Sequence, residues 1–111
     1  MIYAYVRIST SQQNLANQRY ELLNYADRYG CRIDVWTTET VSGAKAYTER
    51  ELGALVNRMG VGDTLLVVEL SRLGRSLMEV MSILHRLMER QMKVISVTEG
   101  LELGDTIKAL R

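Results

Sequence analysis

Two hydrophobic periods alternate along this chain. Residues 2–8 form a run rich in tyrosine, valine and isoleucine, which is typical of a β-strand. Apolar residues then recur every three or four positions over 15–29, which predicts an amphipathic helix that Gly30 ends. A strand buried on both faces is predicted over 64–68, because every residue after the first is apolar.

The same criteria predict the remaining elements. Residues 37–47 lack a helical period and are rich in small polar side chains, so we expect a loop there. Thr48, with Glu51 three positions later, makes the capping-box pattern of a helix start. From Gly104 and Asp105 on, the pattern is again helix-like. The predicted strands cover 2–8, 31–36, 64–68 and 93–97, and the predicted helices cover 11–29, 48–59 and 76–90.

This alternation of strands and helices predicts an α/β fold. We expect a mainly parallel sheet of about four to five strands, with helices on both faces. The carboxyl ends of parallel strands meet at one edge of such a sheet, where ligands usually bind. Ser9 and residues 71–75 each follow a predicted strand at that edge.

Length and composition narrow the class of protein. A chain of 111 residues fits one domain, and with no proline and no low-complexity stretch it has no place for an interdomain linker. The formal net charge of +1 neither favours nor excludes nucleic acid as a partner. Cys31 has no second cysteine to pair with, and no leader or long apolar run is present. We therefore expect a soluble cytoplasmic protein.

The candidate chemistry combines one hydroxyl with several guanidiniums. Arginine offers planar, permanently charged donors that suit phosphate, and Arg7, Arg72 and Arg75 stand at the predicted edge. Ser9 is a candidate nucleophile whose alkoxide these guanidiniums would stabilise. The only histidine, His85, falls on a later helix and is better explained as a helix or dimer contact than as a base.

Simpler explanations fit the same residues. Ser9 and Thr10 have the side chains most common at helix N-caps. Arg72 and Arg75 are three positions apart, so they would share one solvated basic face of a helix. Spacing alone favours these simpler explanations over a catalytic site.

Cofactor motifs are missing from the sequence. It contains no Walker-type glycine-rich loop, no dinucleotide fingerprint and no paired cysteine or histidine spacing for a metal. Cys31 and the methionines are expected to fill gaps in the core or in an interface. Neither a metal nor a nucleotide cofactor is therefore expected.

A family resemblance favours the catalytic interpretation. Residues 3–13, Val41 to Gly43, Arg50, Gly62 with Asp63, and residues 70–75 resemble, in the same order, the motifs of the serine recombinases, the resolvase and DNA invertase family. The resemblance spans the whole chain. It implies an α/β catalytic domain around a mainly parallel sheet, in agreement with the periodicity.

The resemblance also implies a mechanism. Ser9 would attack the scissile phosphate of DNA, leaving a 5′-phosphoserine linkage and a free 3′-hydroxyl. That linkage keeps the energy of the phosphodiester, so rejoining would need neither ATP nor a metal. The residues implied are Arg7, Arg72 and Arg75 as phosphate ligands, Arg50 from the side of the predicted loop, and Gln13, Ser42 and Ser71 as supporting residues.

The chain departs from the family pattern at three places. Ser71 stands where many resolvases carry an aspartate, which removes a carboxylate that could handle the leaving-group proton or orient an arginine. Glu39 stands where an aspartate is frequent, and the stretch between Gly43 and Arg50 is longer by about two residues. The acid of the cleavage step is therefore unassigned.

The resemblance implies further parts and partners. The family follows this domain with a long dimerisation helix and a DNA-binding domain, which we expect beyond Arg111. The implied partners are a double-stranded DNA recombination site and a homodimer that assembles into a tetramer on two synapsed sites. Flexible methionines over 78–92 suit such an association surface. This domain alone is expected to bind DNA poorly and to be inactive.

Two other function classes stay open. A receiver-like signalling module would share the fold, but it would need acidic residues after the strands where this chain has Ser9 and Arg72. A catalytically silent relative that organises or regulates DNA would share every motif, and Ser71 is the residue that suggests it. Resolution, inversion and integration all remain open, as does the DNA site.

Overall fold

The computed structural model describes residues 1–8, 12–40, 51–104 and 107–109. The elements, in chain order, are β1 (Ile2–Ile8), α1 (Gln12–Tyr29), β2 (Val35–Thr40), α2 (Glu51–Arg58), β3 (Thr64–Val67), the short 3-10 helix η2 (Leu70–Arg72), α3 (Leu77–Glu89), β4 (Lys93–Ser96), β5 (Leu101–Leu103) and β6 (Ile107–Ala109). In this part of the chain, no helix is long and apolar enough to cross a membrane.

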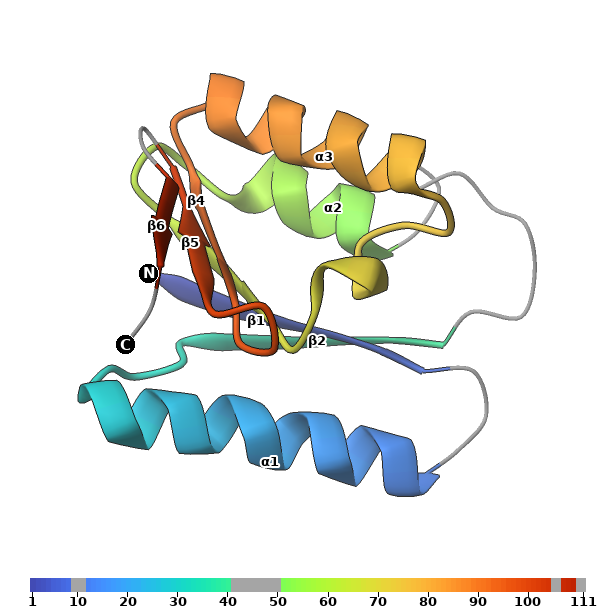
Figure 1. Ribbon diagram of the computed structural model, residues 1–111, viewed down its shortest axis with the longest axis vertical. Helices are drawn as coiled ribbons and strands as arrows, with labels where there is room; N and C mark the ends of the chain where they lie inside the picture. The colour runs from blue at the N-terminus through green and yellow to red at the C-terminus, as the bar shows by residue number, and fades with distance from the viewer. Residues whose placement is uncertain (9–11, 41–50, 105–106, 110–111) are drawn as a thin grey trace.

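The strands form one sheet between two helical layers. Within the described residues the order is β2-β1-β3-β4-β5-β6. The first four strands are parallel, and β5 and β6 continue the sheet in antiparallel pairing. Helix α1 covers one face, whereas α2 and α3 cover the other (Figure 1). The predicted α/β fold, with a mainly parallel sheet and helices on both faces, is confirmed.

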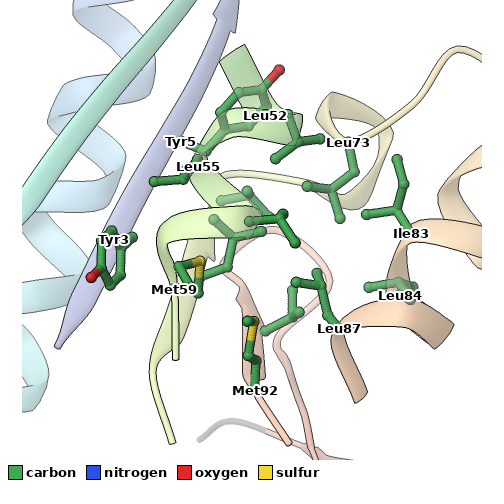
Figure 2. Close-up of a cluster of buried hydrophobic side chains, with 14 of the residues drawn as sticks. Tyr3, Tyr5, Leu52, Leu55, Met59, Leu73, Ile83, Leu84, Leu87 and Met92 are labelled. Atoms are coloured by element: carbon green, nitrogen blue, oxygen red, sulfur yellow. The ribbon is translucent and has the colours of Figure 1, made fainter. Parts of the chain in front are cut away.

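Each face of the sheet carries its own core. Side chains alternate along β1, so Tyr3 and Tyr5 pack toward α2 and α3, while Ala4, Val6 and Ile8 pack toward α1. Figure 2 shows the larger cluster, in which Leu52 and Leu55 of α2 lie near Tyr5, and Ile83, Leu84 and Leu87 come from α3. Both faces of β1 are thus buried, which fixes the position of its carboxyl end.

The second strand lies later than predicted. It pairs with β1 from Tyr3 opposite Val35 to Ile8 opposite Thr40, so the predicted strand over 31–36 and the predicted loop start at position 37 were wrong. Residues 31–34 instead lead out of α1, and Asp34 accepts a hydrogen bond from the Ile2 N–H at 2.8 Å. The strand escaped detection because polar residues, not apolar ones, occupy its buried positions.

The C-terminal segment also differs from the prediction. The helix expected from Gly104 on is absent from the described residues, where β5 and β6 pair as an antiparallel hairpin. Leu101 and Leu103 lie opposite Ala109 and Ile107, so alternating apolar residues extend the sheet by two strands. Tertiary pairing has overridden a weak local helical pattern.

Candidate active site

Two of the predicted arginines meet where the parallel strands end, at what we call the carboxyl edge. Arg7 is the penultimate residue of β1, and Arg72 closes η2, which follows the neighbouring strand β3. The Arg7 Nη2 donates to the Ser71 carbonyl oxygen at 2.9 Å, and the Arg72 Nη1 reaches the Arg7 carbonyl oxygen at 3.5 Å. Residues 64 positions apart in the sequence thus form one cluster.

The turn that carries Arg72 is held by backbone hydrogen bonds, by a buried side chain and by a carboxylate. Its backbone closes through hydrogen bonds from Arg72 N–H to the Glu69 carbonyl at 3.1 Å and from Leu73 N–H to the Leu70 carbonyl at 3.0 Å. Leu73 is fully buried, and Figure 2 shows it pointing into the core cluster. At the start of the turn, the Glu99 carboxylate accepts the Leu70 N–H at 3.2 Å and also the Ser96 hydroxyl. The turn is therefore held at both ends.

A carboxylate pairs with Arg72 inside this cluster. Glu69 Oε1 lies 3.2 Å from Arg72 Nε, and the two side chains are 33% and 25% exposed. The Nε atom is shielded from water, and none of the described residues hydrogen-bonds to it with good geometry. Only the terminal nitrogens of Arg72 are left to face a ligand.

Arg75 lies further out than the other two arginines. Its side chain is exposed, whereas that of Arg72 is partly buried. Its backbone N–H donates to Glu79 Oε1 at 2.9 Å, while the Ser76 hydroxyl accepts the Glu79 N–H at 3.1 Å and caps α3. The predicted helix over 76–90 is confirmed, with a reciprocal cap at its start.

Gly74 explains how these segments fit together. A Cβ atom at this position would lie 3.0 Å from the Glu79 side chain and 3.0 Å from the Val80 backbone nitrogen. A side chain here would therefore require the first turn of α3 to move by a few tenths of an ångström. Gly74 lets the chain between Arg72 and Arg75 pass close to α3 without that movement.

Several predicted residues lie outside the described residues. These are Ser9, Ser42 and Arg50, and the capping Thr48. Gln13 belongs to α1, but its side chain is not described. Ser71 is exposed and contributes its backbone carbonyl to Arg7. Position 9 follows directly after β1, whose last residue is Ile8.

Gln18 is a site residue that the sequence reasoning missed. It is only 3% exposed, and its Nε2 donates to the Arg7 carbonyl at 2.9 Å and to Asn14. Its Oε1 is buried without a partner among the described residues. A signal was available, because Gln18 interrupts the apolar face of α1 between Leu15 and Leu22.

Glu39 stood out in the sequence only as a departure from the family pattern. In the structure it is a buried carboxylate that accepts three hydrogen bonds. It is 5% exposed and accepts the Tyr5 hydroxyl at 2.5 Å, the Glu51 N–H at 3.0 Å and the Leu52 N–H at 3.3 Å. Hydrogen bonds from the first turn of α2 and the positive end of its dipole stabilise this charge. Glu39 therefore ties the end of β2 to the start of α2.

An apolar groove adjoins the cluster. It has a volume of about 380 Å³ and lies between η2 and α3, with Leu70, Val80 and Leu84 in its lining and Glu99 at its edge. Leu77 and Met81 also line it, and these two side chains and Met78 expose 76%, 56% and 79% of their surface. His85 is also exposed on α3, where it lies 3.3 Å from Glu89.

A comparison with protein families shows which family the chain belongs to. The family model described as the N-terminal domain of resolvase matches residues 2–110. The chain belongs to the resolvase family. The described residues of this resolvase domain hold no group of three or more histidine, cysteine, aspartate or glutamate side chains that could bind a metal.

Curated relatives agree with this assignment. The chain is 35% identical over 100 residues to the Tn2501 transposon resolvase of Escherichia coli, and 35% identical over 103 residues to the DNA-invertase of Escherichia phage P1. These alignments cover 89% and 92% of this chain but 50% and 51% of the relatives. The resolvase domain described here thus spans about half the length of the curated relatives it matches.

Solved structures share the fold. The N-terminal catalytic domain of TP901-1 integrase superposes with a TM-score of 0.72 at 27% identity, over 91% of this chain and 79% of that one. A resolvase family site-specific recombinase from Streptococcus pneumoniae gives a TM-score of 0.74 at 22% identity, over 95% of this chain and 76% of that one. The predicted resemblance to this family is confirmed.

Proposed function

We propose that this chain is the catalytic domain of a site-specific DNA recombinase that cuts and rejoins strands through a 5′-phosphoserine intermediate. Ser9 Oγ attacks the scissile phosphorus. The Ser9 hydroxyl gives up its proton as a bond between Oγ and phosphorus forms, the bond from phosphorus to the 3′ oxygen breaks, and that oxygen gains a proton and leaves as a hydroxyl. Rejoining runs the same steps in reverse with a new 3′-hydroxyl.

The observation that carries this proposal is the arginine cluster next to position 9. Arg7 precedes Ser9 by two residues, and Arg72 reaches the Arg7 backbone from η2, which follows the neighbouring strand β3. Two guanidiniums at the end of a doubly buried strand give a preorganised positive site, whose donors stabilise the extra charge of a pentacoordinate phosphorus. Membership of the resolvase family supports the same conclusion.

The other proposed site residues have graded roles. Arg75 and Arg50 complete the phosphate contacts when DNA is bound, while Gln13, Ser42 and Ser71 support the site. Gln18 belongs with them as the residue that holds the Arg7 carbonyl. No metal or nucleotide takes part in the proposed reaction.

The proposed partners are a double-stranded recombination site and other copies of the protein. Two duplexes cut on both strands need four nucleophiles, which a tetramer built from two dimers supplies. The exposed apolar side chains at the start of α3 suit an association surface that repacks. A long dimerisation helix and a DNA-binding domain beyond this chain would complete the recombinase, which would act beside the chromosome in the cytoplasm.

Covalent trapping tests the function. The full-length protein is incubated with a duplex nicked so that religation is blocked, beside the Ser9→Ala variant. We expect a protein adduct on the 5′ end with the unaltered protein and none with Ser9→Ala. No adduct on DNA that is demonstrably bound would contradict the proposal and favour the catalytically silent relative.

A further inference from the structure

The ion pair between Glu69 and Arg72 has a role that neither the motif nor the fold assigns. Both side chains are partly buried at the carboxyl edge, and Glu69 Oε1 approaches Arg72 Nε at 3.2 Å. The Nε atom itself has no exposure to water. This carboxylate therefore lies beside the buried side of the guanidinium as a charge partner, without a well-aligned hydrogen bond to Nε.

The contacts of Arg72 fix its guanidinium plane from two sides. Glu69 lies beside Nε, and the Arg7 carbonyl oxygen lies 3.5 Å from Nη1. A planar guanidinium held at two corners presents its remaining donors in one direction, so less rotamer freedom is lost when a phosphate binds.

The carboxylate also has an electrostatic cost for binding. A negative charge beside a phosphate ligand weakens the attraction between that ligand and Arg72, while it strengthens the orientation of the guanidinium. Ser71, between the two residues, offers its backbone carbonyl to Arg7 and leaves Glu69 as the carboxylate closest in sequence to Arg72.

We infer that Glu69 is a positioning residue for the proposed cleavage reaction: it orients Arg72 toward the scissile phosphate at the expense of DNA affinity. This inference rests on the proposed function and adds to it a residue outside the transferred motif. It predicts opposite effects on two measured quantities, since loss of the charge slows cleavage but leaves DNA binding equal or tighter.

The test compares Glu69→Gln and Glu69→Asp with the unaltered full-length protein on the nicked duplex. Cleavage is measured as single-turnover adduct formation at saturating DNA, and affinity as a separate Kd in the Ser9→Ala background, which does not cut. Glu89→Gln is the matched control, because Glu89 is an exposed carboxylate on α3, paired with His85. Thermal melting of each variant monitors folding.

We expect Glu69→Gln to slow adduct formation about tenfold, because a misaligned catalytic group costs this much or more. Its Kd should be unchanged or lower. The cleavage rate of Glu69→Asp should fall between those of Glu69→Gln and the unaltered protein, and the rate and Kd of Glu89→Gln should match those of the unaltered protein.

Equal cleavage rates for Glu69→Gln and the unaltered protein would overturn the inference while leaving the proposed function intact. A Glu69→Gln protein that loses stability and affinity but cleaves at the normal rate would also overturn it. No adduct from the unaltered protein would instead reject the proposed function, and this inference with it.

Discussion

The two edges of the parallel strands differ in how far their polar groups are satisfied by hydrogen bonds. At the amino edge, where the strands begin, two aspartate carboxylates accept hydrogen bonds from backbone N–H groups and from the Met1 amino group. Asp63 accepts the Gly60 N–H at 2.8 Å and the Met1 amino group at 3.1 Å, and Asp34 accepts the Ile2 N–H. At the carboxyl edge, Gln18 Oε1 and Arg72 Nε are buried without a hydrogen bond from the described residues.

This difference indicates that the amino edge contributes mainly to stability and the carboxyl edge mainly to the proposed function. Buried polar atoms without partners are uncommon in folded proteins and are concentrated where a ligand or a reaction needs them. The contacts of the amino edge hold strands together, whereas those of the carboxyl edge arrange charged side chains around position 9. Substitutions at the two edges should therefore affect different measurements.

The largest expected effect is on the chemistry at the carboxyl edge. Arg72→Ala in the full-length protein should lower the single-turnover cleavage rate by at least about 10²-fold, because a preorganised charge at the reacting phosphate is lost. Its melting temperature is measured beside the rate, because Arg72 is only 25% exposed and the substitution also removes the ion pair with Glu69. Arg86→Ala, an exposed arginine on α3, is the control. Equal cleavage by the two variants would contradict the assignment of Arg72.

A steric substitution tests the close passage that separates Arg72 from Arg75. Gly74→Ala should lower the free energy of unfolding by about 1–3 kcal/mol, because the new Cβ would meet the Val80 backbone at 3.0 Å. Gly60→Ala is a matched control, since its Cβ would meet only Asp63 Oδ2 at 3.8 Å. Chemical denaturation measures both. The packing argument fails if Gly74→Ala is as stable as Gly60→Ala.

The next expected effect concerns the buried carboxylate between β2 and α2. Tyr5→Phe removes the 2.5 Å hydrogen bond to Glu39 and should lower the free energy of unfolding by about 1–2 kcal/mol. Tyr20→Phe controls for loss of a hydroxyl, because Tyr20 is 64% exposed. Chemical denaturation should show the loss for Tyr5→Phe alone. A Tyr5→Phe protein of full stability would show that backbone donors suffice for Glu39.

The smallest expected effect lies at the amino edge and depends on pH. The hydrogen bond from Gly60, with help from the Met1 amino group, holds the pKa of the Asp63 carboxyl below its usual value. The stability from this carboxylate is present above the usual pKa and disappears as pH falls through the lowered pKa. Asp63→Asn should therefore cost less than about 1 kcal/mol at pH 7, since water screens this edge, and nothing near pH 2.

Thermal melts of Asp63→Asn against pH, with the exposed Asp27→Asn as control, measure this dependence. The expected difference between Asp63→Asn and the unaltered protein shrinks as the solution becomes acidic. A difference that stayed constant from pH 7 to pH 2 would mean that the Asp63 charge is not the source.

The sequence predicted the parts of the fold whose local pattern agrees with their burial. β1, β3, α1 and α3 have continuous apolar runs or apolar stripes, and each was predicted within a few residues of its bounds. β2 was misplaced because Thr37 and Glu39 are its buried side chains. A polar residue that is buried through a distant partner, such as Tyr5 for Glu39, leaves no periodic signal.

The candidate site was predictable in part for the same reason. Arg7 was found at the end of the first predicted strand and Arg72 just after a later one, both also through the motifs, and the structure brings them together. Gln18 and Glu69 were missed because their importance comes from contacts across the fold, to the Arg7 carbonyl and to Arg72 Nε. The assignments to Ser9, Ser42 and Arg50 remain predictions.

Mapping the covalent linkage tests the central claim most directly. The trapped complex of the full-length protein and nicked DNA is digested with protease and nuclease, and the modified peptide is sequenced by mass spectrometry. The account predicts a nucleotide joined through its 5′-phosphate to Ser9, in the peptide that follows β1. Linkage to any other residue, or through a 3′-phosphate, would contradict it.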